Sequence, residues 1–132
     1  MPRMRSLLTP TTTIHAHCDL PCGVYDPAQA KIEAQSVKAC QEKYQASDDD
    51  VFKQRAVQIK EERADLVKHH LWVLWTDYFK PEHLEAHPQL HQLFWDATKS
   101  AGANKKSLDP ADGQKLIDLV DQIGDVFAAT KK

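Results

Sequence analysis

Apolar residues recur along most of this chain at the three- and four-residue spacing of an amphipathic helix, and no segment shows the alternation typical of a strand. The clearest segment follows Asp109-Pro110, a cap-plus-proline helix start, and its inward residues are Leu116, Leu119, Val120, Ile123, Val126 and Phe127. Another is predicted from Pro88 to Ala103, with Leu90, Leu93, Phe94 and Ala97 inward. The second half of the chain therefore predicts two helices.

The first half of the chain predicts two more helices. Asp26 suits the N-cap of one helix, with Pro27 in the first turn and Gln29 at capping-box spacing, and this helix ends near Gln45. Its looser apolar pattern consists of Ile32, Val37, Ala39, Cys40 and Tyr44. The next helix starts after residues 47–50, whose serine and three aspartates favour a helix N-terminus. It is expected to be about 30 residues and roughly 45 Å long.

This long helix has no internal glycine or proline before Pro81, and residues 81–88 are predicted to be a connection. Its predicted buried face consists of Leu66, Val67, His70, Leu71, Leu74, Trp75 and Tyr78. Four helices with short links predict an all-α fold, an antiparallel four-helix bundle preceded by an irregular N-terminal segment. A chain of 132 residues suits a single domain of this kind.

Charge and composition narrow the function classes. The chain has 17 basic and 19 acidic side chains, for a formal charge of -2, which argues against a nucleic-acid partner or a polybasic membrane anchor. It contains no run of about 18 apolar residues, so no membrane span is expected. Three cysteines are an odd number for a disulfide framework. A reducing, cytoplasmic location is therefore expected.

The candidate chemistry lies in residues 17–25, His-Cys-Asp-Leu-Pro-Cys-Gly-Val-Tyr, which we call the hook. Cys18 and Cys22 are four positions apart around Pro21, and His17 precedes them, so two thiolates and an imidazole can converge on one ion. Such ligands suit nickel, copper or zinc, and two thiolates with backbone nitrogens favour square-planar Ni(II). The cysteine spacing alone also fits an incidental pair, a zinc site or a redox disulfide.

Two segments closely resemble the nickel-dependent superoxide dismutase family. They are residues 17–30, His-Cys-Asp-Leu-Pro-Cys-Gly-Val-Tyr-Asp-Pro-Ala-Gln-Ala, and residues 61–81, from Glu-Glu-Arg-Ala-Asp-Leu-Val to Asp-Tyr-Phe-Lys-Pro. The resemblance implies a four-helix bundle that binds one nickel ion per subunit and disproportionates superoxide to dioxygen and hydrogen peroxide by Ni(II)/Ni(III) cycling. It also implies a homohexamer.

The family likeness gives residues 1–16 a role as a pro-segment. By themselves they indicate an ordinary N-terminal extension, because they lack the apolar stretch of about 7–15 residues that a secretory signal needs. The family begins at the residue equivalent to His17, which implies that a processing peptidase cuts after Ala16. The expected organisation is therefore a pro-segment at 1–16, the hook at 17–25 and the bundle at 26–132.

The resemblance implies a ligand set for the metal. It consists of the terminal amine and imidazole of His17, the amide nitrogen and thiolate of Cys18, and the thiolate of Cys22. An α-amino group with a pKa of about 7.7–8.0 can bind as a neutral nitrogen near neutral pH. Cutting before His17 creates that group, and anionic sulfur and amide donors make Ni(III) accessible.

Further residues acquire roles from the same resemblance. Glu33 and Arg63 would orient the His17 imidazole, as a carboxylate braced by a guanidinium. Tyr25 and Tyr78 would line the approach to the metal, although Tyr78 fits a core position nearly as well. Apart from the resemblance, Lys80, and after it Lys31, are candidates for attracting superoxide, because an anion needs a local positive field in a chain of net negative charge. Solvated surface charges are the commoner role of such residues.

Other features are given structural roles. The histidines and tryptophans are expected in the core, at an interface or on helix surfaces rather than at a second metal or cofactor site; they are His69, His70, His83, His87, His91, Trp72, Trp75 and Trp95. Cys40 departs from the family's two-cysteine habit and is expected to be a buried, inert thiol. A cis bond before Pro21 is plausible in a tight hook. The functional alternatives are a nickel or zinc carrier and a helical bundle without metal.

Overall fold

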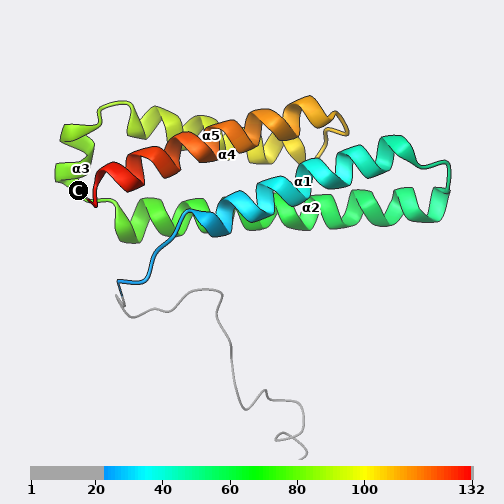
Figure 1. The fold of residues 1–132 in the computed structure, drawn as a ribbon, viewed down its shortest axis with the longest axis horizontal. Coiled ribbons are helices and arrows are strands. Elements are labelled where there is room, and N and C mark those ends of the chain that lie inside the picture. Colours follow the sequence, from blue (N-terminus) through cyan, green and yellow to red (C-terminus); the bar gives the residue numbers. More distant parts are fainter. Residues whose placement is uncertain (1–22, 132) are drawn as a thin grey trace, which may run out of the picture.

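The computed structural model describes residues 23–131, in which four long helices run antiparallel to their neighbours (Figure 1). The helices are α1 (Ala28–Ala46), α2 (Asp50–Val73), a π-helical turn η2 (Leu74–Tyr78) that continues α2, the short α3 (Pro81–Ala86), α4 (Leu90–Asn104) and α5 (Pro110–Ala129). No strand occurs in this range. The predicted all-α four-helix bundle is therefore confirmed. None of the described helices combines the length and apolar character needed to cross a membrane.

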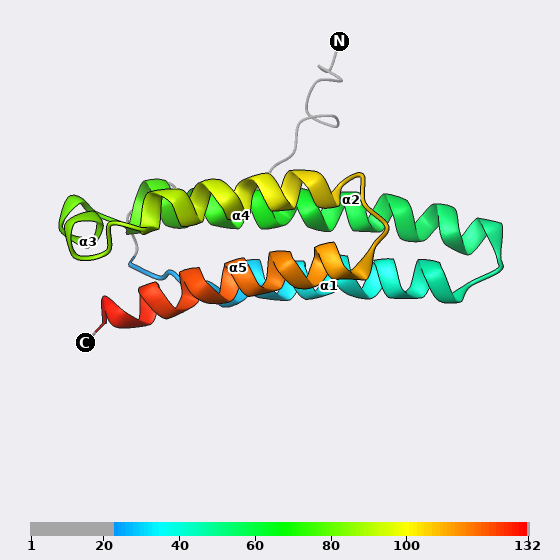
Figure 2. The same cartoon turned by 90° about the horizontal axis from the view of Figure 1, so that it is seen from above.

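The two ends of the bundle are built differently. Helix α1 packs against α2 and α5, and α4 packs against the same two helices on the other side. Figures 1 and 2 show that the α1–α2 hairpin extends beyond the loop between α4 and α5 at one end. At the opposite end, the segment before α1, the end of η2, α3 and the end of α5 come together (Figure 2).

Side-chain caps set the starts of α2 and α5. The Asp49 carboxylate accepts hydrogen bonds from the backbone N–H groups of Val51 and Phe52, at 2.9 and 3.3 Å, and Asp109 accepts from Ala111 at 2.9 Å. These contacts satisfy backbone donors that the first turn leaves unpaired. Asp26 also accepts from Ala28 N at 2.8 Å, but the predicted N-cap is wrong by one residue because Pro27 occupies that position.

The predicted connection at residues 81–88 is wrong over its first six residues, which form α3. Pro81 has a backbone angle suited to the first helical position, and the Lys80 N–H donates to His83 Nδ1 at 3.0 Å. This local pairing of a proline start with a side-chain acceptor explains the extra turn. Helix α4 then begins at Leu90, two residues later than predicted.

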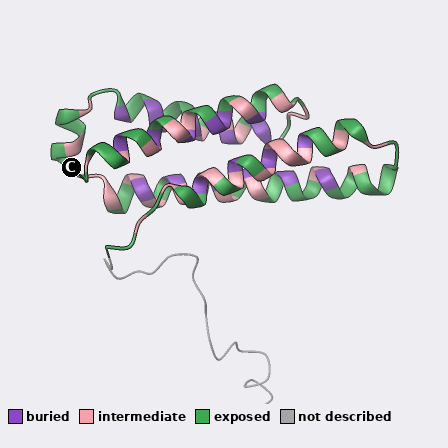
Figure 3. Ribbon diagram, in the orientation of Figure 1, coloured by how far each residue is buried: buried purple, intermediate pink, exposed green. Residues whose placement is uncertain are grey.

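The core runs along the facing sides of the four helices (Figure 3). The predicted inward residues of α4 are all buried, and those of α5 are buried or packed against the core. In α1 the prediction fails at Ile32, whose side chain is 59% exposed. Small residues, Ala30 and Ala34, occupy the buried face instead. Small side chains allow α1 to approach its neighbours closely, which an apolar-periodicity argument based on large residues misses.

Candidate metal centre and its approach cavity

The predicted metal ligands, His17, Cys18 and Cys22, and the Leu20–Pro21 bond lie outside the described residues. The described chain starts at Gly23, whose φ of 75° is a left-handed conformation that favours glycine. Within residues 23–131 no group of three or more His, Cys, Asp or Glu side chains is arranged to hold a metal ion. The hook therefore remains the candidate ligand set.

A cavity of about 410 Å³ opens at the end of the bundle where the hook joins it. Its lining residues, which define what we call the approach cavity, are Gly23, Tyr25, Asp77, Tyr78, Lys80, His83, Thr130 and Lys131. Three of the five residues predicted for catalysis, Tyr25, Tyr78 and Lys80, are thus brought together. The first described residue, Gly23, lines this cavity and directly follows Cys22 in the chain.

The two tyrosines come from different elements. Tyr25 precedes α1, whereas Tyr78 ends η2, where the Phe79 N–H bonds to Leu74 O at 3.0 Å across five residues. Their ring centroids lie 5.7 Å apart at 56°, and both rings pack against the hydrophobic core. Each phenol therefore has an apolar base and a polar edge at the cavity.

Tyr78 is held from several sides by residues that the sequence did not link to it. Its phenol oxygen lies 2.5 Å from Thr130 Oγ1. The His83 ring stacks nearly parallel to it, with centroids 5.7 Å apart at 13°, and the Phe127 ring lies 4.5 Å away. Lys131 Nζ lies 5.0 Å from the Tyr78 ring centroid, within cation–π range.

The charges that line the approach cavity favour an anion. Lys80 and Lys131 each add a positive charge, and Asp77 is the single acidic residue in the lining. Asp77 Oδ1 lies 3.0 Å from the Thr76 hydroxyl oxygen. Lys31, the second candidate for attracting superoxide, instead pairs with Asp121 at 2.8 Å and does not line this cavity.

Glu33 and Arg63 form the pair that the family likeness suggested, though they do not line the approach cavity. Arg63 Nη1 lies 3.3 and 3.2 Å from the two carboxylate oxygens of Glu33 and joins α2 to α1. The Glu33 side chain is only 15% exposed, whereas that of Arg63 is 40% exposed. The contact establishes the pairing; the orientation of His17 by this pair stays a prediction.

Cys40 is a free thiol on α1 and is half-buried rather than buried as expected. Burial raises the pKa of the Cys40 thiol above its usual value, while the nearby positive charges of Arg63, Lys43 and Lys60 lower it by less. The thiol is therefore protonated near neutral pH, a state of low reactivity.

The histidines and tryptophans take structural positions. His83 caps α3, and His91 packs edge-on against Trp75 at 5.4 Å. Trp72 and Trp95 are 51% and 57% exposed, and they line one shallow cavity together with Trp75. They form an aromatic surface across α2, η2 and α4.

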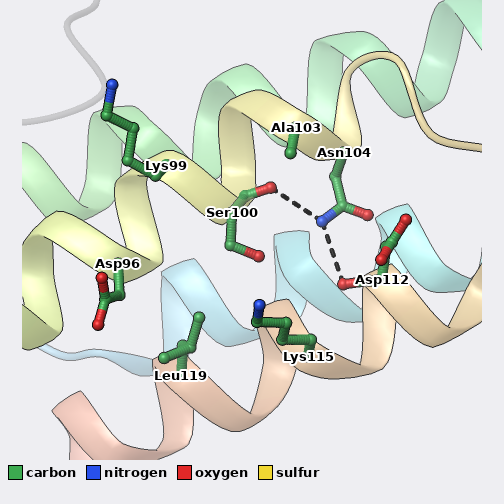
Figure 4. A pocket seen from close by; sticks show the side chains of 8 residues that line it. All are labelled: Asp96, Lys99, Ser100, Ala103, Asn104, Asp112, Lys115 and Leu119. Carbon is green, nitrogen blue, oxygen red and sulfur yellow. Dashed lines mark hydrogen bonds between the residues drawn. The ribbon is translucent and has the colours of Figure 1, made fainter.

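A second polar cavity, of about 450 Å³, lies between α4 and α5 (Figure 4). On its wall the buried Asn104 amide donates to the Ser100 and Asp112 carbonyl oxygens, at 2.9 and 3.1 Å. Of the described residues, none that was predicted for the nickel chemistry lines it. Its polar groups join α4 to α5, a structural role.

Sequence reasoning missed Thr130 and Lys131 at the approach cavity and dismissed His83 from the site. His83 is five residues from Tyr78, so its place beside a candidate tyrosine was open to inference. Thr130 and Lys131 are more than 50 positions from Tyr78, in a C-terminal segment without a motif. Only the packing of α5 against η2 brings them to the cavity.

Comparisons with known proteins point to one family. The sequence profile described as nickel-containing superoxide dismutase matches residues 12–131. The chain is 60% identical over 126 residues to "Superoxide dismutase [Ni]" of Streptomyces coelicolor (strain ATCC BAA-471 / A3(2) / M145), covering 96% of each chain.

Solved structures agree. The chain resembles a native nickel superoxide dismutase structure with a TM-score of 0.86 and 61% identity, covering 88% of this chain and 100% of that one. It also resembles a nickel-containing superoxide dismutase whose nickel ligation corresponds to the oxidised state. There the TM-score is 0.85 and the identity 62%, over 87% of this chain and 98% of that one.

Proposed function

Because this chain belongs to the family of nickel-containing superoxide dismutases, we propose that it disproportionates superoxide at a nickel ion held by its N-terminal hook. The protein is an oxidoreductase of the superoxide dismutase class, and its cofactor is nickel. The finer proposal concerns which residues bind the ion, how the chain matures and which side chains handle the substrate.

The donor atoms of the hook fit nickel. We assign the metal to the His17 amine and imidazole, the Cys18 amide nitrogen and thiolate, and the Cys22 thiolate, with one ion per subunit. Soft thiolates and nitrogens suit this metal better than oxygen ligands would. When bound, nickel supplies the one-electron exchange between Ni(II) and Ni(III) that oxidises one superoxide and reduces the next.

The surrounding residues have separate tasks in this proposal. Glu33 accepts a hydrogen bond from the His17 ring and is itself held by Arg63, a carboxylate–histidine arrangement that fixes a ligand's orientation. Tyr25 and Tyr78 order water at the approach cavity for the two protons that each peroxide requires. Lys80, joined by Lys131, raises the local concentration of the superoxide anion.

The observation that carries the proposal is the composition of the approach cavity. The family likeness assigns Tyr25 and Tyr78 to the approach, the charge of superoxide suggests Lys80, and all three line one cavity with Gly23, the residue after Cys22 in the chain. Two phenols and an ammonium group in one lining support a reaction of an anion that also needs protons.

We propose that a processing peptidase cuts after Ala16. The family likeness places the mature N-terminus at His17, and only cleavage at this point frees the α-amino group that can bind the metal as a neutral nitrogen. Residues 1–16 contribute none of the proposed ligands.

We further propose a homohexamer in the cytoplasm. The exposed aromatic surface of Trp72 and Trp95 supports burial against other subunits, because large apolar patches usually mark interaction sites. Free thiolate ligands require the reducing conditions of that compartment. Light scattering of the nickel-loaded protein that begins at His17 should give six times the chain mass, and a monomer would contradict the assembly.

The decisive experiment compares superoxide decay by two nickel-loaded proteins, one beginning at His17 and one retaining Ala16. Fast decay is expected only in the cut form, because Ala16 would convert the ligand amine into an amide. The cut protein with Cys22→Ser is the matched control and should lose nickel and activity together.

The outcomes separate the rival functions. Negligible decay by both forms, with one nickel bound per chain, would overturn the dismutase proposal and indicate a nickel carrier. Zinc bound in preference to nickel, without redox change, would indicate a zinc carrier. Decay that is equally fast in both forms would contradict the role of cleavage.

A further inference from the structure

Thr130, which follows α5, contacts the phenol of Tyr78 at the approach cavity. We propose that Thr130 is a positioning residue that takes the phenol proton of Tyr78 in a hydrogen bond, so that Tyr78 presents only acceptor lone pairs to the cavity. The hydrogen-bond direction stands on geometry alone, and its catalytic consequence rests on the function proposed above.

The direction follows from counting hydrogens. Thr130 Oγ1 lies 2.6 Å from the Phe127 carbonyl oxygen and 2.5 Å from the Tyr78 phenol oxygen. A carbonyl oxygen can only accept, and a threonine hydroxyl has a single hydrogen to donate. The Thr130 hydrogen therefore goes to Phe127, and Tyr78 is the donor in the second bond. If Thr130 donated to Tyr78 instead, Thr130 Oγ1 and the Phe127 carbonyl oxygen would face each other as two acceptors at 2.6 Å.

Packing on several sides of the Tyr78 ring fixes the position of its phenol oxygen. The rings of Phe127 and Phe79 lie 4.5 and 5.1 Å from it, and His83 stacks on it at 5.7 Å. Lys131 Nζ lies 5.0 Å from the ring and 5.2 Å from Phe127. Residues at the C-terminal end of α5 and just after it thus contact both the aromatic ring and the hydroxyl group of Tyr78.

The direction of this hydrogen bond gives Tyr78 and the two lysines different roles at the approach cavity. Superoxide is an anion that can only accept hydrogen bonds, so a phenol whose proton is occupied does not hold it. Water and hydrogen peroxide carry O–H groups and can donate to the free lone pairs of Tyr78. The ammonium groups of Lys80 and Lys131 remain as donors for the anion. Tyr78 is therefore specialised for ordering water and not for binding superoxide.

The first test is spectroscopic and uses the nickel-free 132-residue chain. The intensity ratio of the tyrosine Raman doublet reports whether a phenol oxygen donates or accepts, and subtracting the spectrum of Tyr78→Phe isolates Tyr78 from the other tyrosines. Thr130→Val removes the acceptor at nearly constant volume and should move the ratio away from that of a donor. Thr130→Ser keeps the hydroxyl and should retain the original ratio. An unchanged ratio in Thr130→Val would overturn the proposal.

The second test is kinetic and uses nickel-loaded protein that begins at His17. In Thr130→Val the released phenol proton can bond to superoxide, so KM should fall about 3- to 10-fold, the range of one hydrogen bond, and kcat should fall with it. Thr130→Ser should restore both. Equal KM values in all three proteins would overturn the catalytic consequence. Absence of superoxide decay in the parent protein would overturn the proposed function alone, since the Raman result stands independently.

Discussion

Glu33 illustrates how one nearly buried carboxylate can have a structural partner and a functional one. Arg63 occupies one side of it through a single nitrogen placed 3.3 and 3.2 Å from its two oxygens. A carboxylate has about four lone-pair positions, so it can accept a further bond from a histidine ring. The ion pair alone adds modest stability because Arg63 is partly in water. A role in catalysis would therefore show as lost activity without lost stability.

We expect Glu33→Gln to reduce superoxide decay by the nickel-loaded, cut protein about tenfold or more, the scale of losing a ligand-orienting contact. The free energy of unfolding should fall by about 1 kcal/mol or less. Pulse radiolysis and urea unfolding measure the two effects. Glu42→Gln is the matched control, because Glu42 pairs with Lys38 on the exposed face of the same helix. Similar activities in the two variants would remove Glu33 from the site.

At the scale of elements, η2 determines how α2 ends. Regular α-helical hydrogen bonds give way to a five-residue spacing at Leu74–Tyr78, and the Thr76 hydroxyl bonds back to Trp72 O at 2.8 Å. Such π-turns rotate the side chains that follow relative to a continuous α-helix, and they are frequent at functional sites. Here the turn places Tyr78 beside Tyr25 and Thr130. The sequence predicted a continuous helix, because the same residues favour either geometry.

The end of α4 depends on a buried lysine of α2. Lys60 is 1% exposed, and its ammonium group donates to the carbonyl oxygens of Asn104 and Lys105 at 2.7 and 2.6 Å. These carbonyls have no partner within their own helix, so the ammonium group serves as a C-terminal cap. Burial lowers the pKa of Lys60, and the negative charge of Glu61 opposes this by less.

Lys60→Met should therefore lower the free energy of unfolding by about 1–3 kcal/mol, because it leaves buried carbonyls unpaired. Urea unfolding near neutral pH tests this, and Lys106→Met on the exposed surface should change stability by less than about 0.5 kcal/mol. The folded-state pKa of Lys60 is below the unfolded value of 10.5, so the unfolded chain binds more protons between these two values. The stability advantage of the parent over Lys60→Met should therefore grow as pH rises through that window. A constant difference would contradict the buried charge.

At the scale of the whole molecule, the bundle depends on close contact between α1 and α5. A Cβ atom added at Gly113 would lie 2.3 Å from Gln41 Oε1 and 2.9 Å from the Lys38 backbone, so the helices would have to separate. Gly124 lies on the same helix, but there the nearest atom is Pro27 Cγ, at 3.9 Å. Close packing of the helices therefore requires a glycine at position 113 but not at position 124.

Gly113→Ala is expected to lower the free energy of unfolding by about 1–3 kcal/mol, the usual cost of overpacking. Gly124→Ala should raise it by up to about 1 kcal/mol, since alanine favours a helix over glycine. Urea unfolding of both variants makes the comparison within one helix. Stabilisation by both would show that α1 and α5 are less tightly packed than the structure indicates.

The sequence by itself determined the four long helices, and it predicts the chemistry of the hook. Helix starts depend on a cap such as Asp109 and the proline after it, which are neighbours in the chain, and the predicted metal donors lie within six consecutive residues. Properties of this kind are local, so the residue order is sufficient to predict them. The family likeness then supplied the pairing of Glu33 with Arg63.

Only the tertiary structure decided which distant residues share a site. Thr130 lies 52 positions from Tyr78, and Lys60 lies 44 from the carbonyl it caps, so neither contact has a signature in the sequence. The exposure of Ile32 also depends on tertiary packing and has no signature in the sequence. Which face of a helix is buried, and which atoms meet there, depends on how closely four helices can approach one another. That approach is set by small side chains such as Ala34 and Gly113, whose periodicity contributes little to an apolar pattern.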